Sequence, residues 1–226
     1  VAEDECSYVP VREAVQKTMY LGLDGTGIPM RHEAVEGRVG KQPDGTAKTR
    51  EVKLVCVWTA ESKDKEGNPI RDKGSVSYNA AIESAAYVEK DESPSEFALR
   101  VEREARRTGF ENAPRQVIIG DGAKWIWALA YELFPHGIQI VDLYHALETV
   151  STVAKKIFGV ESELGEQKAQ SWRALIERGA IDEIIEALTS FEEKHPEATT
   201  CIHYLETNRD RMRYPLFRRL GLCVSS

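Results

Sequence analysis

Short apolar runs separated by polar segments dominate the first two thirds of the chain, and this alternation constrains the fold more than any other feature. Three runs rich in β-forming residues come first: "TMYLGLDGTGI" at residues 18–28, "EVKLVCVWTA" at 51–60 and "SVSYNA" at 75–80. An amphipathic segment follows, in which Phe97, Val101 and Ala105 recur at the four-residue spacing of a helix. Ser93 and Glu96 suit the capping box of this helix. The sequence therefore predicts three strands and then a helix.

Strands and helices alternate further along the chain. "QVIIGDG" at 116–122 and "GIQIVDLYHA" at 137–146 predict two more strands, the second leading into a helix, and "AKWIWALAYELF" predicts a helix between them. From about residue 151 to 213 the pattern is helical throughout. This order predicts an α/β chain with a mixed sheet first and a helical part afterwards. A ribonuclease-H-like sheet has this order of elements, as do many other α/β folds.

Two polar stretches interrupt the predicted strands. Residues 30–50 contain "PDGT" and predict a hairpin arm or mobile loop, and residues 62–74 predict a loop. The "DGTG" after "LGL" reads as a turn that ends the first strand. Trp125 and Trp127 are expected to pack their helix against the sheet.

The composition narrows the class of protein. A chain of 226 residues with 42% hydrophobic residues suits one large domain or one and a half. No apolar stretch is long enough to span a membrane, and the acidic start "VAEDECSYVP" is unlike a secretory signal. Because the chain begins with Val1, it reads as a fragment. Four cysteines without a CxxC pair predict free thiols in a reducing cytosol: Cys6, Cys56, Cys201 and Cys223.

Charge is distributed unevenly. The net charge of −7 argues against a nucleic-acid-binding protein. The run at residues 209–219 is nevertheless basic, and Asp210 is its single acid. The arginines of this basic run are Arg209, Arg211, Arg213, Arg218 and Arg219. A basic patch acts locally whatever the net charge is. Its alternative interpretation is a solvated helix face.

Two aspartates occur in the same context. Asp24 in "LGLDGTG" and Asp121 in "IIGDGAK" each follow an apolar run and precede glycine. Functional groups gather at strand ends in α/β sheets, and two carboxylates that meet there repel each other unless a cation lies between them. Oxygen ligands suit Mg²⁺ or Mn²⁺, which activate a nucleophile in phosphodiester chemistry. The alternatives are a turn residue for Asp24 and a helix N-cap for Asp121.

A third polar motif is "VDLYHA". Asp142 and His145 stand three residues apart at a strand-to-helix junction, so their side chains would share a face of a helix. The alternative is a capping aspartate and an ordinary histidine.

Five segments together resemble the ISKra-type bacterial insertion-sequence transposases, relatives of the Mutator-like group. They are "GLDGTGIPM", "GKQPDGTAKTREVKL", "IIGDGAKWIW", "QIVDLYHA" and "NRDRMRYPLFRRLGL". The resemblance covers the chain from about residue 20 to the end. It implies a ribonuclease-H-like core interrupted by an α-helical insertion, with a first part at 1–150, the insertion at 151–215 and a return to the core at 216–226. It also implies DDE transposition, which is metal-dependent cleavage at element ends and strand transfer into target DNA.

The resemblance assigns roles to particular residues. Asp24 and Asp121 match the first two catalytic carboxylates and would bind the metal, with Gly120 and Gly122 keeping the approach open. Asp142 and His145 match the D-x-x-H signature, for which orienting DNA or supporting the metal site is expected. The arginines of the basic run would contact DNA phosphates, and Lys41, Lys48 and Arg50 form a second candidate DNA contact.

One feature departs from the family pattern. The third catalytic carboxylate would follow Ser226, and neither Glu148 nor Glu206 matches its position. We therefore expect a central catalytic piece that is inactive alone. DNA as the partner, a homo-oligomer for the full-length protein and a cytoplasmic, nucleoid-associated location are implied by the resemblance.

Other functions remain open at this stage. "DGTG" also suits a haloacid-dehalogenase-type phosphatase, but the nucleophilic aspartate expected two residues earlier is replaced by Gly22. An actin-like ATPase would need a second phosphate loop, which the sequence does not show. A decayed transposase that only binds DNA or a protein partner is the non-enzymatic alternative.

Overall fold

The computed structural model describes residues 17–37, 47–82 and 95–226. Ser93, Lys41 and Cys6, for which the sequence makes predictions, lie outside these residues. The elements run in this order: β1 (Thr18–Pro29), α1 (His32–Val35), β2 (Thr49–Trp58), β3 (Ser62–Lys63), β4 (Pro69–Ile70), β5 (Ser77–Ile82), α2 (Glu96–Thr108), η2 (Phe110–Asn112), β6 (Arg115–Gly120), α3 (Lys124–Leu133), β7 (Ile138–Val141), α4 (Leu143–Phe158), α5 (Glu163–Arg178), α6 (Ile181–Thr189), α7 (Pro196–Asn208), η3 (Arg209–Met212) and α8 (Tyr214–Arg219). The predicted α/β class is confirmed, with a mixed five-stranded sheet and helices.

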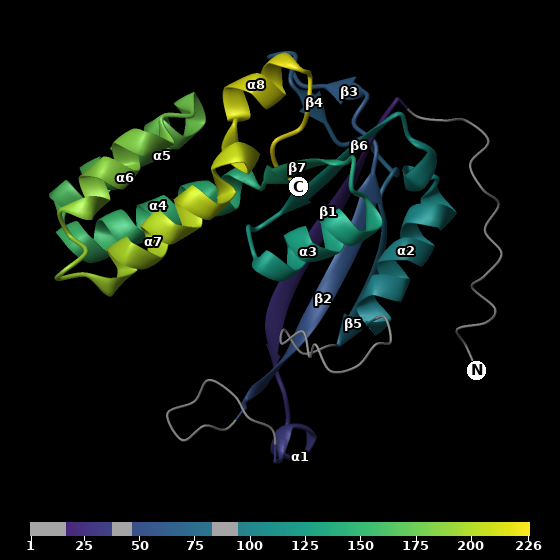
Figure 1. Cartoon of the computed structure of the whole chain (residues 1–226), viewed down its shortest axis with the longest axis horizontal. Coiled ribbons are helices and arrows are strands. Elements are labelled where there is room, and N and C mark those ends of the chain that lie inside the picture. The colour runs from purple at the N-terminus through teal and green to yellow at the C-terminus, as the bar shows by residue number, and fades with distance from the viewer. Residues whose placement is uncertain (1–16, 38–46, 83–94) are drawn as a thin grey trace. The chain divides into compact units, whose positions relative to one another are not determined.

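Five strands form the main sheet in the order β5-β2-β1-β6-β7 (Figure 1). β2 pairs antiparallel with both β1 and β5. Arg115, the first residue of β6, donates its amide to the carbonyl of Lys17 just before β1, so these two strands start at the same end. At the other end, Asp142 after β7 donates to Gly120, the last residue of β6. β6 and β7 therefore run in the same direction as β1.

β1 has a buried half and an exposed half. Residues 18–23 are buried, whereas Asp24 and most residues after it are exposed or partly exposed. The predicted turn at "DGTG" is wrong, because β2 continues to pair with β1 as far as Pro29 opposite Thr49. The two strands thus form the long hairpin arm that the polar stretch at 30–50 predicted, with α1 after β1 (Figure 1).

Helices α2 and α3 supply the apolar cover of one face of this sheet. Phe97 of α2 meets Trp125 of α3 edge to face, with ring centroids 5.7 Å apart. Lys53 of β2 is buried, and its Nζ lies 4.8 Å from the centroid of the Trp125 ring. Trp127 is also buried. Trp125 therefore has the packing role that the sequence predicted, whereas for Trp127 the structure shows burial alone.

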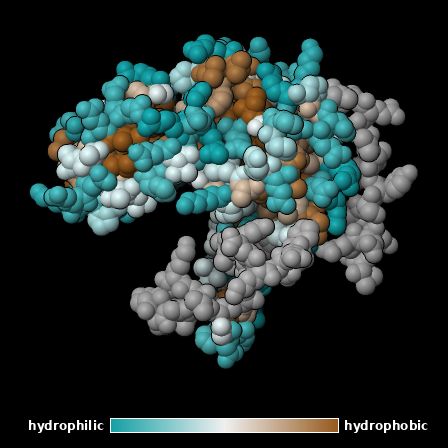
Figure 2. Space-filling model, viewed as in Figure 1, coloured by the Kyte–Doolittle hydropathy of each residue, from teal (hydrophilic) through white to brown (hydrophobic). Residues whose placement is uncertain are grey.

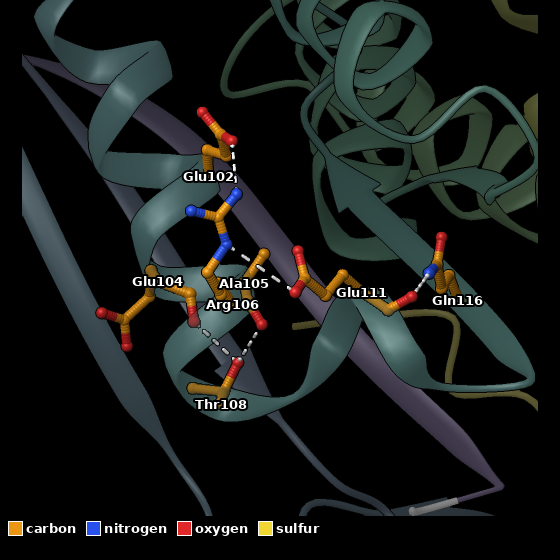
Figure 3. Close-up of polar contacts among 7 residues, drawn as sticks. All are labelled: Glu102, Glu104, Ala105, Arg106, Thr108, Glu111 and Gln116. Carbon is orange, nitrogen blue, oxygen red and sulfur yellow. Dashed lines mark hydrogen bonds and ion pairs between the residues drawn. The ribbon is translucent and has the colours of Figure 1, made fainter. Parts of the chain in front are cut away.

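The ends of α2 are fixed by specific polar contacts. Ser95 caps the helix by accepting a hydrogen bond from the amide of Ala98, and Glu96 is the first residue of the helix. At the other end, Arg106 pairs with Glu102 at 2.8 Å and approaches Glu111 at 3.8 Å. Gln116 of β6 donates to the carbonyl of Glu111 at 2.9 Å (Figure 3). These contacts tie the end of α2, through η2, to the strand that leads to Asp121.

The stretch from about residue 151 to 213 is helical, as predicted. Helix α4 is continuous across residues 150 and 151, and it packs against α5 and α7. Phe158 at its end meets Trp172 of α5 and Phe191, with centroids 6.0 and 5.2 Å apart. On the visible face of these helices hydrophilic residues predominate, with a few hydrophobic residues between them (Figure 2).

Two compact units interleave along the chain. The first consists of residues 1–60, 71–118 and 124–138, and the second of residues 61–70, 119–123 and 139–226. The stretch at 62–74, predicted as a loop, contains the short β3–β4 hairpin, whose turn is held by Asp64 accepting from the amides of Glu66 and Asn68. Within the described ranges, no helix is long and apolar enough to cross a membrane.

Candidate active site

Asp24 lies inside β1, at the point where the strand leaves the buried core. Its Oδ1 accepts a hydrogen bond from the amide of Gly25 at 2.8 Å. Gly25 pairs with Lys53 and therefore shares the face that α3 covers, while Asp24 points to the opposite face. Its cross-strand partner Leu54 is 38% exposed. Asp24 is thus exposed to solvent, on the face of β1 opposite to the one that Trp125 contacts.

The space beside Asp24 along β1 is tightly filled. A Cβ atom at Gly22 would lie 2.7 Å from Sγ of Cys56 and 3.0 Å from the ring of Trp58. Burial raises the pKa of the Cys56 thiol, and the negative charge of Asp24 adds to this, although Arg71 opposes it. Cys56 is a free thiol, as predicted. A side chain larger than hydrogen at position 22 would displace this packing.

Asp121 directly follows β6 and is partly exposed. Its Oδ1 accepts a hydrogen bond from the amide of Ala123 at 2.7 Å. Because α3 begins at Lys124, this bond closes a turn before the helix rather than capping its first residues.

Gly122 is required for a different reason from the predicted one. Its φ is +102°, and an added Cβ would lie 2.6 Å from Cε2 of Tyr204 and 3.1 Å from Nδ2 of Asn208. The prediction that Gly122 keeps the approach open is wrong, because α7 fills the space beside it. Glycine at this position allows a helix to pack directly against the loop backbone.

Tyr204 and Asn208 of α7 are site residues that the sequence reasoning missed. The Tyr204 hydroxyl donates to the carbonyl of Asp121 at 3.1 Å, and Nδ2 of Asn208 donates to the carbonyl of Gly122 at 3.4 Å. Burial raises the pKa of Tyr204, with a further contribution from the charge of Asp121. The signal available in the sequence was a tyrosine and an asparagine four residues apart on one predicted helix.

Asp142 caps α4 and also holds the end of the chain. Its Oδ1 accepts from the amide of Tyr144 at 2.9 Å, and its Oδ2 accepts from both the amide and the hydroxyl of Ser226 at 2.7 Å. Asp142 is buried, whereas His145 in the first turn of α4 is exposed. The alternative interpretation, a capping aspartate, therefore accounts for Oδ1 of Asp142 but not for Oδ2. The expected shared helix face with His145 is wrong, because Asp142 precedes the helix.

The five arginines of the basic run differ in their surroundings. Arg209 pairs with Asp182 at 2.8 Å, and Arg213 pairs with Asp210. Arg211 donates to Oε1 of Gln139 at 2.7 Å and to the carbonyl of Thr207 at 3.1 Å, and burial lowers its pKa. Arg218 and Arg219 are exposed on α8. These last two are the arginines most available to an external anion.

The second candidate DNA contact lies near the hairpin arm. Lys48 is exposed just before β2, and Arg50 pairs with Ile28 within the arm. Lys41 lies outside the described residues.

The predicted site residues are divided between the two units. Asp24, Lys48 and Arg50 belong to the first, and Asp121, Asp142, His145 and the five arginines of the basic run belong to the second. Among the described residues, no group of three or more histidine, cysteine, aspartate or glutamate side chains is arranged to hold a metal ion. Neither protein-family models nor curated proteins give a match to this chain.

Proposed function

We propose that this chain carries the catalytic core of a DDE transposase of the ISKra type, with a ribonuclease-H-like sheet. The observation that carries the proposal is the sheet order. Counted along the chain, the five strands stand in the order third, second, first, fourth, fifth, with the first three antiparallel and the last two parallel to the first. Asp24 lies in the central strand of this order, and Asp121 follows its neighbour β6. The order and the two aspartates agree with what the sequence resemblance implies.

Asp24 and Asp121 would hold Mg²⁺ or Mn²⁺. Each is a carboxylate with Oδ1 bonded to a nearby main-chain amide. Such hard oxygen donors fit these ions. When bound, the metal would supply activation of a water or 3′-hydroxyl and stabilisation of the leaving oxygen. The residues of the chain would bind and orient it.

Metal binding provides the first test. Mn²⁺ binding to the native chain would be measured by electron paramagnetic resonance, beside Asp24→Asn, Asp121→Asn and, as a control, Asp182→Asn on the exposed surface of α6. We expect each of the first two variants to weaken binding by at least roughly 10-fold, because each removes a charged ligand. The control should bind like the native chain.

Two outcomes would count against the proposal. Unchanged binding in both aspartate variants would remove its metal basis. A loss in only one variant would mean that the two carboxylates do not share an ion.

DNA would be the partner, bound in part by Arg218 and Arg219. The double variant Arg218→Ala/Arg219→Ala should reduce the slope of log affinity against log salt by about 2, since each lost phosphate contact reduces it by roughly 0.9. Arg173→Ala/Arg178→Ala is a matched control, because both arginines are exposed on α5 outside the basic run. Equal slopes for the two double variants would refute this role for α8.

The rival functions make different predictions. A haloacid-dehalogenase-type phosphatase needs a nucleophile at position 22, where the packing of Cys56 and Trp58 leaves no room for a side chain. A decayed remnant would bind DNA without aspartate-dependent Mn²⁺ binding. The homo-oligomer and the nucleoid-associated location belong to the proposal through the resemblance alone.

A further inference from the structure

The loop that carries Asp121 is held by one helix through its main chain. Tyr204 and Asn208 stand one turn apart on α7, and they donate to the consecutive carbonyls of Asp121 and Gly122. Asn208 is completely buried, and its Nδ2 also donates to the carbonyl of Tyr204 at 3.1 Å. The two hydrogen bonds therefore come from a single rigid face of α7.

Close packing leaves this loop little freedom to move toward α7. An added Cβ at Gly122 would overlap the Tyr204 ring at 2.6 Å. The positive φ of Gly122 aims the following peptide so that the amide of Ala123 reaches Oδ1 of Asp121 at 2.7 Å. The direction of the Asp121 carboxylate thus follows from the main chain, and α7 fixes the main chain.

We propose that Tyr204 and Asn208 are positioning residues that hold the Asp121 carboxylate in the orientation that binds the metal. This inference rests on the proposed function. It makes the helical part of the chain a component of the active site rather than an appended domain. Ligand orientation by neighbouring hydrogen bonds commonly changes metal affinity by roughly 10- to 100-fold.

The test uses the full chain and two readouts. Tyr204→Phe removes the hydroxyl but keeps the ring against Gly122, and Asn208→Ala removes the amide. Tyr214→Phe is the matched control, because the Tyr214 hydroxyl is also buried and donates to a main-chain carbonyl, that of Val141, at 3.2 Å. The readouts are the Mn²⁺ dissociation constant and, without metal, the amide NMR shifts of Gly122 and Ala123.

We expect Tyr204→Phe and Asn208→Ala to weaken Mn²⁺ binding by roughly 10-fold and to move the Ala123 amide shift. Tyr214→Phe should leave both readouts near their native values. Should Asn208→Ala fail to fold, the isosteric Tyr204→Phe decides the question alone.

The outcomes separate the two proposals. Native Mn²⁺ affinity and native Ala123 shifts in a folded Tyr204→Phe variant would overturn the positioning role while leaving the proposed function intact. A native chain whose Mn²⁺ binding does not depend on Asp121 would overturn the proposed function and this inference with it. Asp121→Asn would reveal that case, because its Mn²⁺ affinity would equal that of the native chain.

Discussion

Replacing Gly122 by alanine tests the packing of α7 on the Asp121 loop most directly. The φ of +102° costs an alanine about 1–2 kcal/mol relative to glycine. The added methyl would lie 2.6 Å from the Tyr204 ring, and such overpacking costs about 1–3 kcal/mol. Together these terms lower the free energy of unfolding by about 2–5 kcal/mol.

Gly109→Ala separates the two terms. Gly109 also has a positive φ, +79°, but apart from its chain neighbours no heavy atom of the described residues lies within 4 Å of its added Cβ. Only the conformational cost of about 1–2 kcal/mol applies there. Urea unfolding followed by circular dichroism would compare both variants with the native chain.

A double variant sharpens the comparison. With Tyr204→Ala in the background, the methyl at position 122 no longer meets the ring, so the cost of Gly122→Ala should fall toward that of Gly109→Ala. The reasoning fails if Gly122→Ala costs no more than Gly109→Ala in the native background. It also fails if Tyr204→Ala leaves the cost unchanged.

Three further predictions concern single residues. Ser95→Ala should lower the free energy of unfolding by about 1 kcal/mol, since it removes the cap of α2, and urea unfolding would measure this. Arg211→Ala should cost about 0.5–1.5 kcal/mol by removing its hydrogen bonds to Gln139 and to the Thr207 carbonyl, whereas Arg218→Ala should be nearly neutral. Burial raises the pKa of Cys201 to about 12, so the stability due to its neutral thiol is complete below the unfolded pKa of about 8.5 and is lost as pH rises toward 12. The free energy of unfolding should therefore fall less steeply between pH 8.5 and 10 in Cys201→Ala than in the native chain, and parallel slopes would contradict this.

The strands were predictable because each one corresponds to an apolar run of neighbouring residues that the sequence shows directly. The apolar runs around Val55 and Ile118 form buried strands in the structure, and the helical pattern after residue 151 forms helices. The turn at "DGTG" was mispredicted because glycines favour turns locally, while the partners that keep residues 24–29 extended lie on β2, 20 to 30 residues further along the chain. Partner strands outweigh local preference in such cases.

The candidate site was predictable only in part, because contacts between residues distant in sequence leave no local pattern. The aspartates stand in local motifs that a single sequence reveals, so Asp24 and Asp121 could be named as candidates from the sequence alone. The residues that hold the Asp121 loop lie 83 and 86 positions further along the chain, and no local pattern connects them to it. The role of Gly122 was misassigned because its neighbour α7 is equally distant in sequence.

The separation in sequence between the Asp121 loop and α7 matters while the chain is being synthesised. The carbonyl of Asp121 leaves the ribosome 83 residues before the hydroxyl that binds it. At a synthesis rate of about 5–20 residues per second, the loop waits roughly 4–17 seconds for α7. Ser226 reaches Asp142 after a similar interval of 84 residues. During that time the nascent loop has neither partner, and a ribosome-bound chain stalled before α7 would display a protease-sensitive "GDG" that the finished protein protects.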